Sequence, residues 1–278
     1  MKTLTIPNKD THLFASVYPN EGRETVLLLH GGPGVPDNLT EVAELLVDNF
    51  QVICFHQRGT ALSPCQNKDY SMEGYLSDIE CLANYFSLQK FHLFGHSWGG
   101  LYAQIYAQHH PERVLSLFLC SPSSGTGSHW RETEKEVFGF NKSKCDFMEF
   151  LGMGWNNLLG MLGNDKAYQR LFEQVLENYN KGFADVGTAS FQLENVRAEP
   201  INLTRKELLN YPLLHNKPTP NFAITVTYGE SDIYGESKKY VSDRFPTGSF
   251  FTIEKCGHIP WLHNKNIFED IVQGHYHI

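Results

Sequence analysis

Short apolar runs alternate with helix-like segments in the first 120 residues of the chain. The apolar runs are residues 24–30, 51–56, 90–95 and 114–120. Continuous apolar runs of this length are typical of strands buried on both faces of a parallel sheet. The segments between them carry apolar residues at helical spacing, over 40–49, 71–88 and 99–109. Strands that alternate with helices predict crossover connections and a mostly parallel sheet.

The alternation stops after the fourth run and resumes near residue 222. Residues 121–212 hold no strand-like run and are rich in helix formers and aromatic residues. The pattern is completed by a strand at 222–230, a helix near 237–244, a strand at 249–254 and a helix at 267–273. We therefore predict an α/β fold with a mostly parallel central sheet flanked by helices. Residues 1–122 and 213–278 would form the core domain, and residues 123–212 an inserted helical cap.

The net charge narrows the range of partners. The chain has 278 residues and a formal net charge of −8. Nucleic acids and anionic membrane surfaces attract clustered basic residues, and the sequence has no block rich in lysine and arginine. We therefore expect neither nucleic acid nor a membrane as a partner, and a small molecule or a short peptide as substrate. The oligomeric state stays open.

The N-terminus and the cysteines indicate a cytoplasmic protein. The first 20 residues lack the apolar stretch of a signal peptide, and no apolar run is long enough to span a bilayer. Six cysteines are scattered without Cys-x-x-Cys spacing, which favours reduced thiols over a disulfide framework and gives no zinc-ligand pattern.

The motif with the most specific chemistry is Gly-x-Ser-x-Gly at residues 95–99. It lies directly after a predicted strand and directly before a predicted helix. A serine on such a tight strand-to-helix turn is held in a strained conformation with its hydroxyl above the sheet, and flanking glycines let the two elements approach closely. This context predicts that Ser97 is a nucleophile.

A serine nucleophile needs a base, and the base needs a group to orient it. His258 follows the last predicted strand, and Asp232 follows the strand at 222–230, so both lie at the sheet edge to which Ser97 points. The order Ser, Asp, His along the chain is that of α/β-hydrolases. We predict His258 as base and Asp232 as orienting acid, with Glu230 and Asp243 as alternatives to Asp232.

Two backbone N–H groups are predicted to form an oxyanion hole. A glycine-rich loop, His-Gly-Gly-Pro-Gly at 30–34, follows the first buried strand. Gly32 is the expected donor from this loop, and Trp98, the residue after the nucleophile, supplies the other. A phosphate-binding loop is the alternative, but the sequence lacks both the Gly-x-Gly-x-x-Gly pattern and a Walker lysine.

These motifs together resemble the proline iminopeptidase family of the α/β-hydrolase superfamily. The similar segments are HGGPG at 30–34, HQRGTALSP at 56–64, GHSWGG at 95–100, GESD at 229–232 and CGHIPW at 256–261. The resemblance implies an α/β-hydrolase fold with a helical cap and removal of N-terminal residues, often proline, from peptides. It also implies the same triad and oxyanion donors. His56 stands where the family usually has aspartate, in a region that is mainly structural.

The substrate depends on the cap. An aminopeptidase must pair the ammonium of its substrate with carboxylates, because an unpaired buried charge costs several kcal/mol. In the family, glutamates of the cap do this, and Glu194 and Glu199 are the candidates here, with Trp155 and Phe191 as candidate pocket residues. The alternatives are an esterase or lactonase acting on a small uncharged acyl substrate, and a ligand receptor without turnover. Hydrolysis through an acyl-enzyme requires no metal and no organic cofactor.

Overall fold

The strands of the computed structural model form one sheet. Residues 1–9, 11–183, 186, 191–215 and 220–278 are described. The strands are β1 (Lys2–Asn8), β2 (Thr11–Tyr18), β3 (Thr25–Leu29), β4 (Gln51–Phe55), β5 (Phe91–His96), β6 (Val114–Cys120), β7 (Ala223–Gly229) and β8 (Ser249–Ile253). Their order across the sheet is β1-β2-β4-β3-β5-β6-β7-β8. Among the described strands, the pairs β1–β2 and β2–β4 are antiparallel and the other five pairs are parallel, so the predicted mostly parallel sheet is confirmed.

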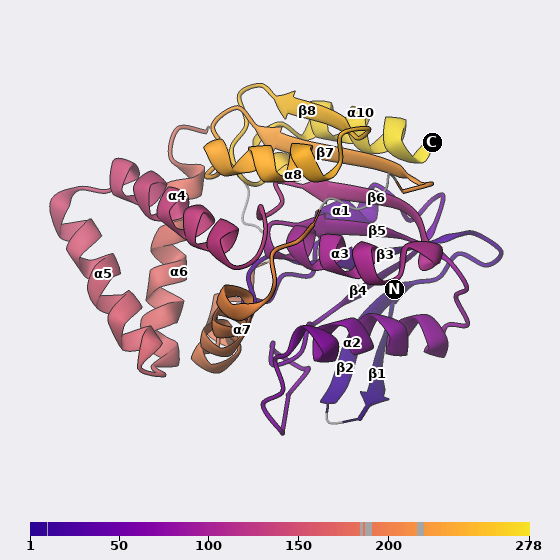
Figure 1. The fold of residues 1–278 in the computed structure, drawn as a ribbon, viewed down its shortest axis with the longest axis horizontal. Helices are drawn as coiled ribbons and strands as arrows, with labels where there is room; N and C mark the ends of the chain where they lie inside the picture. Colours follow the sequence, from indigo (N-terminus) through magenta and orange to yellow (C-terminus); the bar gives the residue numbers. More distant parts are fainter. Residues whose placement is uncertain (10, 184–185, 187–190, 216–219) are drawn as a thin grey trace.

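Helices cover both faces of this sheet (Figure 1). On one face, α2 (Met72–Tyr85), α3 (Trp98–His109) and α8 (Lys239–Arg244) pack on the strands. On the other face lie α1 (Thr40–Glu44), α9 (Pro260–His263) and α10 (Lys265–Tyr276). Both faces of the central strands are therefore buried, which explains why their sequences are continuously apolar.

The first helix is shorter than its sequence predicts. A helix over 40–49 capped by Thr40 is the expectation, but α1 ends at Glu44 and its N-cap position is Leu39, with φ 46°. The N–H of Leu39 donates to the carboxylate of Asp37 at 2.9 Å, so the Asp37 side chain organises this turn. Residues 45–49 form turns because the chain must enter β4 at Gln51.

In the described part of the chain between β6 and β7 there are four longer helices. They are α4 (Ser128–Lys144), α5 (Phe147–Met161), α6 (Asp165–Asn180) and α7 (Ala198–Asn210). Figure 1 shows α4, α5 and α6 at the left of the view, beyond one end of the sheet. Asp146 begins α5 with a capping box, because its carboxylate accepts from the Glu149 N–H and the Glu149 side chain bonds back. The boundaries of the predicted insertion, 123–212, stay a prediction.

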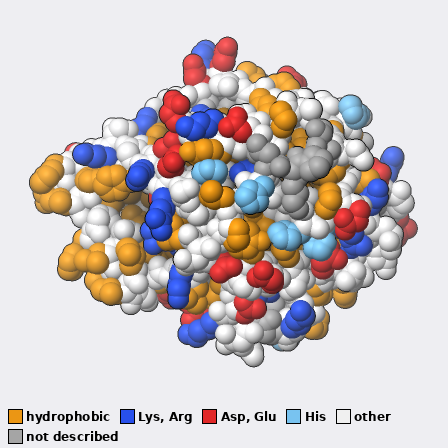
Figure 2. Space-filling model, viewed as in Figure 1, with side chains coloured by type: hydrophobic (Ala, Val, Ile, Leu, Met, Phe, Trp, Pro, Cys, Tyr) orange, Lys and Arg blue, Asp and Glu red, His pale blue; other side chains and the backbone are white. Residues whose placement is uncertain are grey.

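Large apolar side chains are exposed on α5. They are Phe147, Met148, Leu151, Trp155, Leu158 and Met161. Figure 2 shows apolar side chains gathered at the left of the molecule, where Figure 1 places α5. Among the described helices, none is long and apolar enough to cross a membrane.

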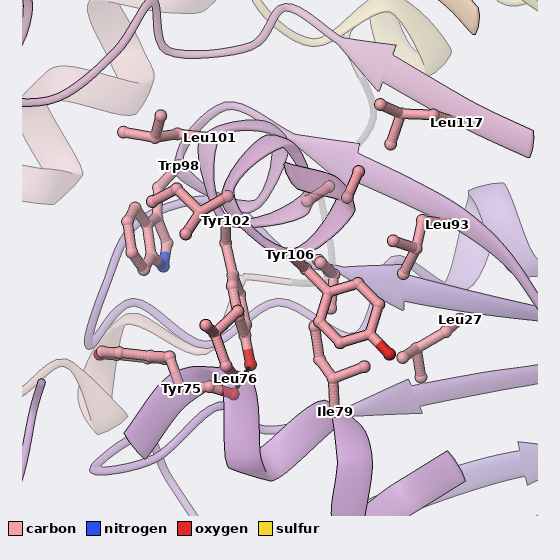
Figure 3. Packing of buried hydrophobic residues seen from close by; sticks show 14 of the residues in the cluster. Leu27, Tyr75, Leu76, Ile79, Leu93, Trp98, Leu101, Tyr102, Tyr106 and Leu117 are labelled. Atoms are coloured by element: carbon pink, nitrogen blue, oxygen red, sulfur yellow. Dashed lines mark hydrogen bonds between the residues drawn. The ribbon is translucent and has the colours of Figure 1, made fainter. Parts of the chain in front are cut away.

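Aromatic packing fixes the start of α3. The indole of Trp98 is buried, stacks on Tyr102 and meets the ring of Tyr75 edge-on, with ring centroids 5.8 and 5.4 Å away (Figure 3). Its Nε1 donates to the Gln57 side chain at 2.7 Å, and Gln57 donates in turn to the backbone oxygen of His30 at 2.9 Å. The first turn of α3 therefore contacts α2 and the end of β3. These contacts hold Ser97, the residue before Trp98, in place.

Candidate active site

Ser97 sits on a strained turn between β5 and α3. Its backbone angles are φ 54° and ψ −117°, a conformation that costs about 1–3 kcal/mol for a non-glycine residue. The turn is tight enough that a Cβ added at Gly99 would clash with the backbone oxygen of Leu29 in β3. Glycine at position 99 therefore allows α3 to lie close to β3, which is the role expected of the glycines that flank the serine.

A chain of hydrogen bonds joins the three residues singled out by the sequence. Ser97 Oγ lies 3.0 Å from Nε2 of His258, and Nδ1 of His258 lies 3.0 Å from Oδ1 of Asp232. Ser97, Asp232 and His258 come from turns that follow β5, β7 and β8. These three strands end at one edge of the sheet because β5, β6, β7 and β8 are parallel neighbours. The arrangement can move a proton from the serine hydroxyl to an imidazole held by a carboxylate.

Asp232 is buried among hydrogen-bond donors. Its Oδ2 accepts from the Ser121 hydroxyl at 2.6 Å, and Oδ1 accepts from the Tyr234 N–H at 3.3 Å. Burial by itself raises the pKa of Asp232, but the charge and hydrogen bond of His258 and the hydrogen bond from Ser121 outweigh it, and the pKa is lowered to about 2. The carboxylate is therefore ionised at neutral pH. The alternative Glu230 instead accepts from the exposed N–H of Lys255.

The neighbouring histidine, His96, does not face the serine hydroxyl. Its Nε2 bonds the backbone oxygen of His258 at 2.9 Å, and its ring packs edge-on against Trp261. Burial lowers the pKa of His96 to about 3, so the ring is neutral. His96 thus supports the loop that carries His258.

The glycine-rich loop lies against Ser97. A Cβ added at Gly31 would approach Cβ of Ser97 to 3.2 Å, and Gly32 has φ +63°. Gly32 and Trp98 both line the cavity above the triad. Trp98 is the first residue of α3, where N–H groups have no intrahelical acceptor. The two predicted donor residues therefore line the same cavity as Ser97.

Tyr234 and Ser123 complete the surroundings of Ser97, and sequence reasoning missed both. The Tyr234 hydroxyl lies 3.2 Å from Ser97 Oγ and 2.7 Å from Ser123 Oγ. Burial raises the pKa of Tyr234 to about 12 and outweighs its hydrogen bonds with Ser123 and Ser97, so the phenol keeps its proton. The signal available in the sequence was the position of Tyr234, two residues after Asp232.

A cavity of about 770 Å³ extends from the triad into the helices that follow β6. Trp155 and Phe191 line it, as expected for pocket residues, and Trp155 is 62% exposed. Glu194 and Glu199 are not among the described residues that line it. The Glu199 carboxylate pairs with Lys68 and accepts from Tyr70, and Glu194 lies exposed in a 3-10 turn.

One ion pair lines the cavity. Arg205 of α7 donates through Nε and Nη2 to the two carboxylate oxygens of Glu134 of α4, at 2.5 and 2.9 Å. The indole N–H of Trp130 also donates to Glu134, at 2.8 Å. Within the described part of the chain, no cluster of three or more histidine, cysteine, aspartate or glutamate side chains has metal-binding geometry.

Comparisons with known proteins agree with this architecture. A family model described as "alpha/beta hydrolase fold" matches residues 24–141. The chain is 33% identical over 121 residues to a proline iminopeptidase of Lactobacillus acidophilus, a match that covers 41% of each chain. It is 26% identical over 227 residues to a putative proline iminopeptidase of Mycoplasma pneumoniae, covering 74% of this chain and 71% of the relative. The predicted resemblance to proline iminopeptidases is therefore confirmed as a resemblance.

A solved structure extends the likeness to the whole fold. The proline iminopeptidase of Mycobacterium smegmatis superposes with a TM-score of 0.71 at 17% identity, covering 99% of this chain and 98% of that one. Identity at this level shows the fold alone. The chain has the α/β-hydrolase fold, as the sequence predicts. In sequence, it spans about two fifths of the length of the first curated relatives it matches.

Proposed function

We propose that this chain, which has the α/β-hydrolase fold, is a serine hydrolase that cleaves a carboxylic ester or amide through an acyl-enzyme. The observation that carries the proposal is the unbroken hydrogen-bond chain from Ser97 Oγ through His258 to Asp232, with both links at 3.0 Å. An ordinary surface serine lacks a base, whereas this one has a base that is oriented by a buried carboxylate.

The steps follow from this geometry. Ser97 Oγ attacks the carbonyl carbon while His258 takes the hydroxyl proton, and the ionised Asp232 stabilises the imidazolium that forms. His258 then gives the proton to the leaving oxygen or nitrogen, which departs and leaves Ser97 acylated. A water molecule, activated by the same histidine, attacks the ester and releases the acid.

The negative charge of the tetrahedral intermediate is proposed to lie against the N–H groups of Gly32 and Trp98. The support is their position beside Ser97, one in a loop whose positive φ requires glycine and one at the N-terminus of α3. A helix N-terminus favours negative charge, and each donor of this kind is worth ~10²–10³ in rate.

The acyl group of the substrate is proposed to be uncharged. Among the described residues that line the cavity, Glu134 and Arg205 are the carboxylate and the guanidinium, and they neutralise each other in a two-point ion pair. The glutamates expected to read an ammonium, Glu194 and Glu199, do not line it. An ammonium entering this cavity would therefore have to compete with Arg205 for Glu134.

The second candidate is a proline-iminopeptidase-like aminopeptidase. Similarity to curated proline iminopeptidases supports it, although that similarity covers about two fifths of this chain for the first of these relatives. In this case Glu134 is the carboxylate that the cavity offers to a substrate ammonium. The helices of residues 123–212 act as the specificity cap in either case.

The test compares two substrate sets. Wild-type protein and Ser97→Ala are assayed with nitrophenyl esters and with proline and other aminoacyl arylamides, and Ser242→Ala, a surface serine on α8, is the control. We expect Ser97→Ala to lose at least about a thousandfold in kcat and Ser242→Ala to keep full activity. Full activity of Ser97→Ala would contradict the proposal, and tight ligand binding without turnover in wild type would favour the receptor alternative.

The two substrate classes separate in the same assay. Cleavage of esters alone contradicts the aminopeptidase. If arylamides are cleaved, Glu134→Gln should raise KM for them, while Glu194→Gln and Glu199→Gln should leave KM unchanged. If Glu194→Gln or Glu199→Gln raised KM instead, that glutamate would be the one that binds the substrate ammonium.

A further inference from the structure

We propose that the cavity receives a large apolar acyl group whose far end lies against α5, and that Gly154 determines how far this group can extend. The inference rests on the serine hydrolase proposed above and names the acyl group for the same site. The proposal rests on the lining of one cavity. Ser97 and His258 lie on its wall, and so do three residues of α5: Leu151, Gly154 and Leu158.

The size of the cavity argues for a large group. Its volume of about 770 Å³ lies in the upper part of the range of small-molecule pockets, ~300–1,000 Å³. An apolar chain that starts at the carbonyl beside Ser97 has room to continue between α4, α5 and α6. Burial of each further methylene is expected to improve binding about fourfold, so a long chain gains more from this space than a short one.

The walls argue for an apolar group. The residues between the triad and α5 are mostly aliphatic and aromatic, and among them are Val137, Met153, Leu171, Phe172, Val175 and Leu176. The carboxylate and the guanidinium on the wall, Glu134 and Arg205, already bond each other. A charged acyl group would lose water without gaining a free partner here.

Gly154 occupies the centre of the cavity-facing side of α5. Residues three and four positions away on a helix share its face, and for Gly154 these are Phe150, Leu151, Asn157 and Leu158. All four line the cavity. A Cβ added at Gly154 meets no atom of the described residues within 4 Å, so the space in front of this backbone is open. This geometry also explains why Leu151 and Leu158 are exposed: they face the cavity.

The same helix offers a matched control in Gly152. A Cβ added there also meets no described atom within 4 Å, and Gly152 does not line the cavity. Of the residues three and four positions away from Gly152, only Trp155 lines it. Replacing either glycine by phenylalanine removes an unfavourable helix residue, so neither variant should lose stability.

The experiment measures kcat/KM for nitrophenyl esters of straight-chain acids from acetate to dodecanoate, with wild type, Gly154→Phe and Gly152→Phe. For wild type we expect kcat/KM to rise with chain length, by up to about fourfold per methylene. Gly154→Phe should lower kcat/KM on the long esters at least tenfold more than on acetate. Gly152→Phe should follow wild type at every length.

The outcomes distinguish this inference from the proposed function. Cleavage of acetate with no gain for longer esters would overturn the inference and leave the hydrolase intact. An equal loss in both glycine variants would overturn the role of Gly154. Absence of all Ser97-dependent cleavage would overturn the proposed function.

A binding measurement covers the case in which turnover is too slow to compare. Ser97→Ala protein is titrated with acetamide and octanamide, with and without Gly154→Phe. Octanamide should bind at least tenfold more tightly than acetamide, and Gly154→Phe should remove this difference. Equal binding of the two amides would contradict the large apolar site.

Discussion

The hydroxyl of Tyr234 lies 3.2 Å from Ser97 Oγ, on the serine that His258 also contacts. In the proposed mechanism Ser97 donates its proton to His258 Nε2, so its oxygen can accept a hydrogen bond from Tyr234, whose oxygen can accept one from Ser123 at 2.7 Å. A donor at this position stabilises negative charge on Oγ as the proton leaves, and again when Oγ becomes the leaving group in deacylation.

Tyr234→Phe is therefore expected to lower kcat about tenfold without changing the fold, because one neutral hydrogen bond contributes about 0.5–1.5 kcal/mol. The rate of Ser97 labelling by a fluorophosphonate should fall by a similar factor, which a merely structural role would not produce. Tyr240→Phe is the control, since that hydroxyl bonds Glu132 at 2.6 Å on another part of the molecule. Unchanged kcat and labelling would remove Tyr234 from the mechanism.

The contact between Gly99 and β3 predicts opposite effects for two similar substitutions. Gly99→Ala places a methyl group against the backbone oxygen of Leu29 and should destabilise by about 1–3 kcal/mol, with loss of activity. Gly139→Ala on α4, where an added Cβ meets no described atom within 4 Å, should stabilise by up to about 1 kcal/mol. Urea unfolding and ester hydrolysis measure both effects. Equal stability of the two variants would show that the turn can relax.

The buried pair of Arg58 and Asp78 predicts a large loss of stability. Arg58 donates through Nε and Nη2 to the two oxygens of Asp78, both at 2.8 Å, and neither side chain is exposed. Arg58→Met leaves a buried carboxylate without this partner and should cost about 3–5 kcal/mol of unfolding free energy. Lys68→Met, which removes an exposed pair with Glu199, should change it by less than about 1 kcal/mol. Similar losses in both variants would contradict this assignment.

Three buried histidines predict loss of stability in mild acid. Burial lowers the pKa of His30 and His275 to about 4 and of His96 to about 3, below the usual 6.5. Below pH 6.5 the unfolded chain binds protons that the folded chain does not, so stability is complete above pH 6.5 and falls towards pH 4. The slope is up to about 1.4 kcal/mol per pH unit for each histidine.

Urea unfolding at pH 7.5, 6.0 and 5.0 measures this slope. His275→Gln should flatten it, because glutamine can still bond Ser116 and Thr225 but cannot gain a proton. His12→Gln, at an exposed position, should leave the slope unchanged. A wild-type slope of zero across this range would contradict the expected neutral histidines.

The sheet was predictable because burial on both faces leaves a direct mark on the sequence. The runs at 24–30 and 114–120 read as strands, and the structure places β3 and β6 there within one or two residues. The positions of Ser97, Asp232 and His258 followed from this, because a residue just after a parallel strand must lie at one edge of the sheet.

Side-chain directions on the helices between β6 and β7 were less predictable, since they depend on how these helices pack. Glu199, in the first turn of α7, turns towards Lys68 and Tyr70 of the core, whereas Glu134 of α4 faces the cavity. Nothing in the sequence around either residue distinguishes them. Tyr234 was missed for a related reason. It is 137 residues away from Ser97 in the sequence, and the turn after β7 decides whether its side chain reaches the serine.

The pairing of β6 with β7 has a consequence for how this molecule can change. The two strands are parallel neighbours, so the chain leaves the sheet after Cys120 at one edge and re-enters it at Ala223, which pairs with Ser116, at the opposite edge. Ser121 follows β6 and Asp232 follows β7, and the two residues hydrogen-bond each other at 2.6 Å at the edge where both strands end. The triad is therefore built outside the helical segment, and we expect a chimaera that carries this segment of another hydrolase, with both connections to the sheet kept, to take that protein's substrate range while Ser97, Asp232 and His258 keep their geometry.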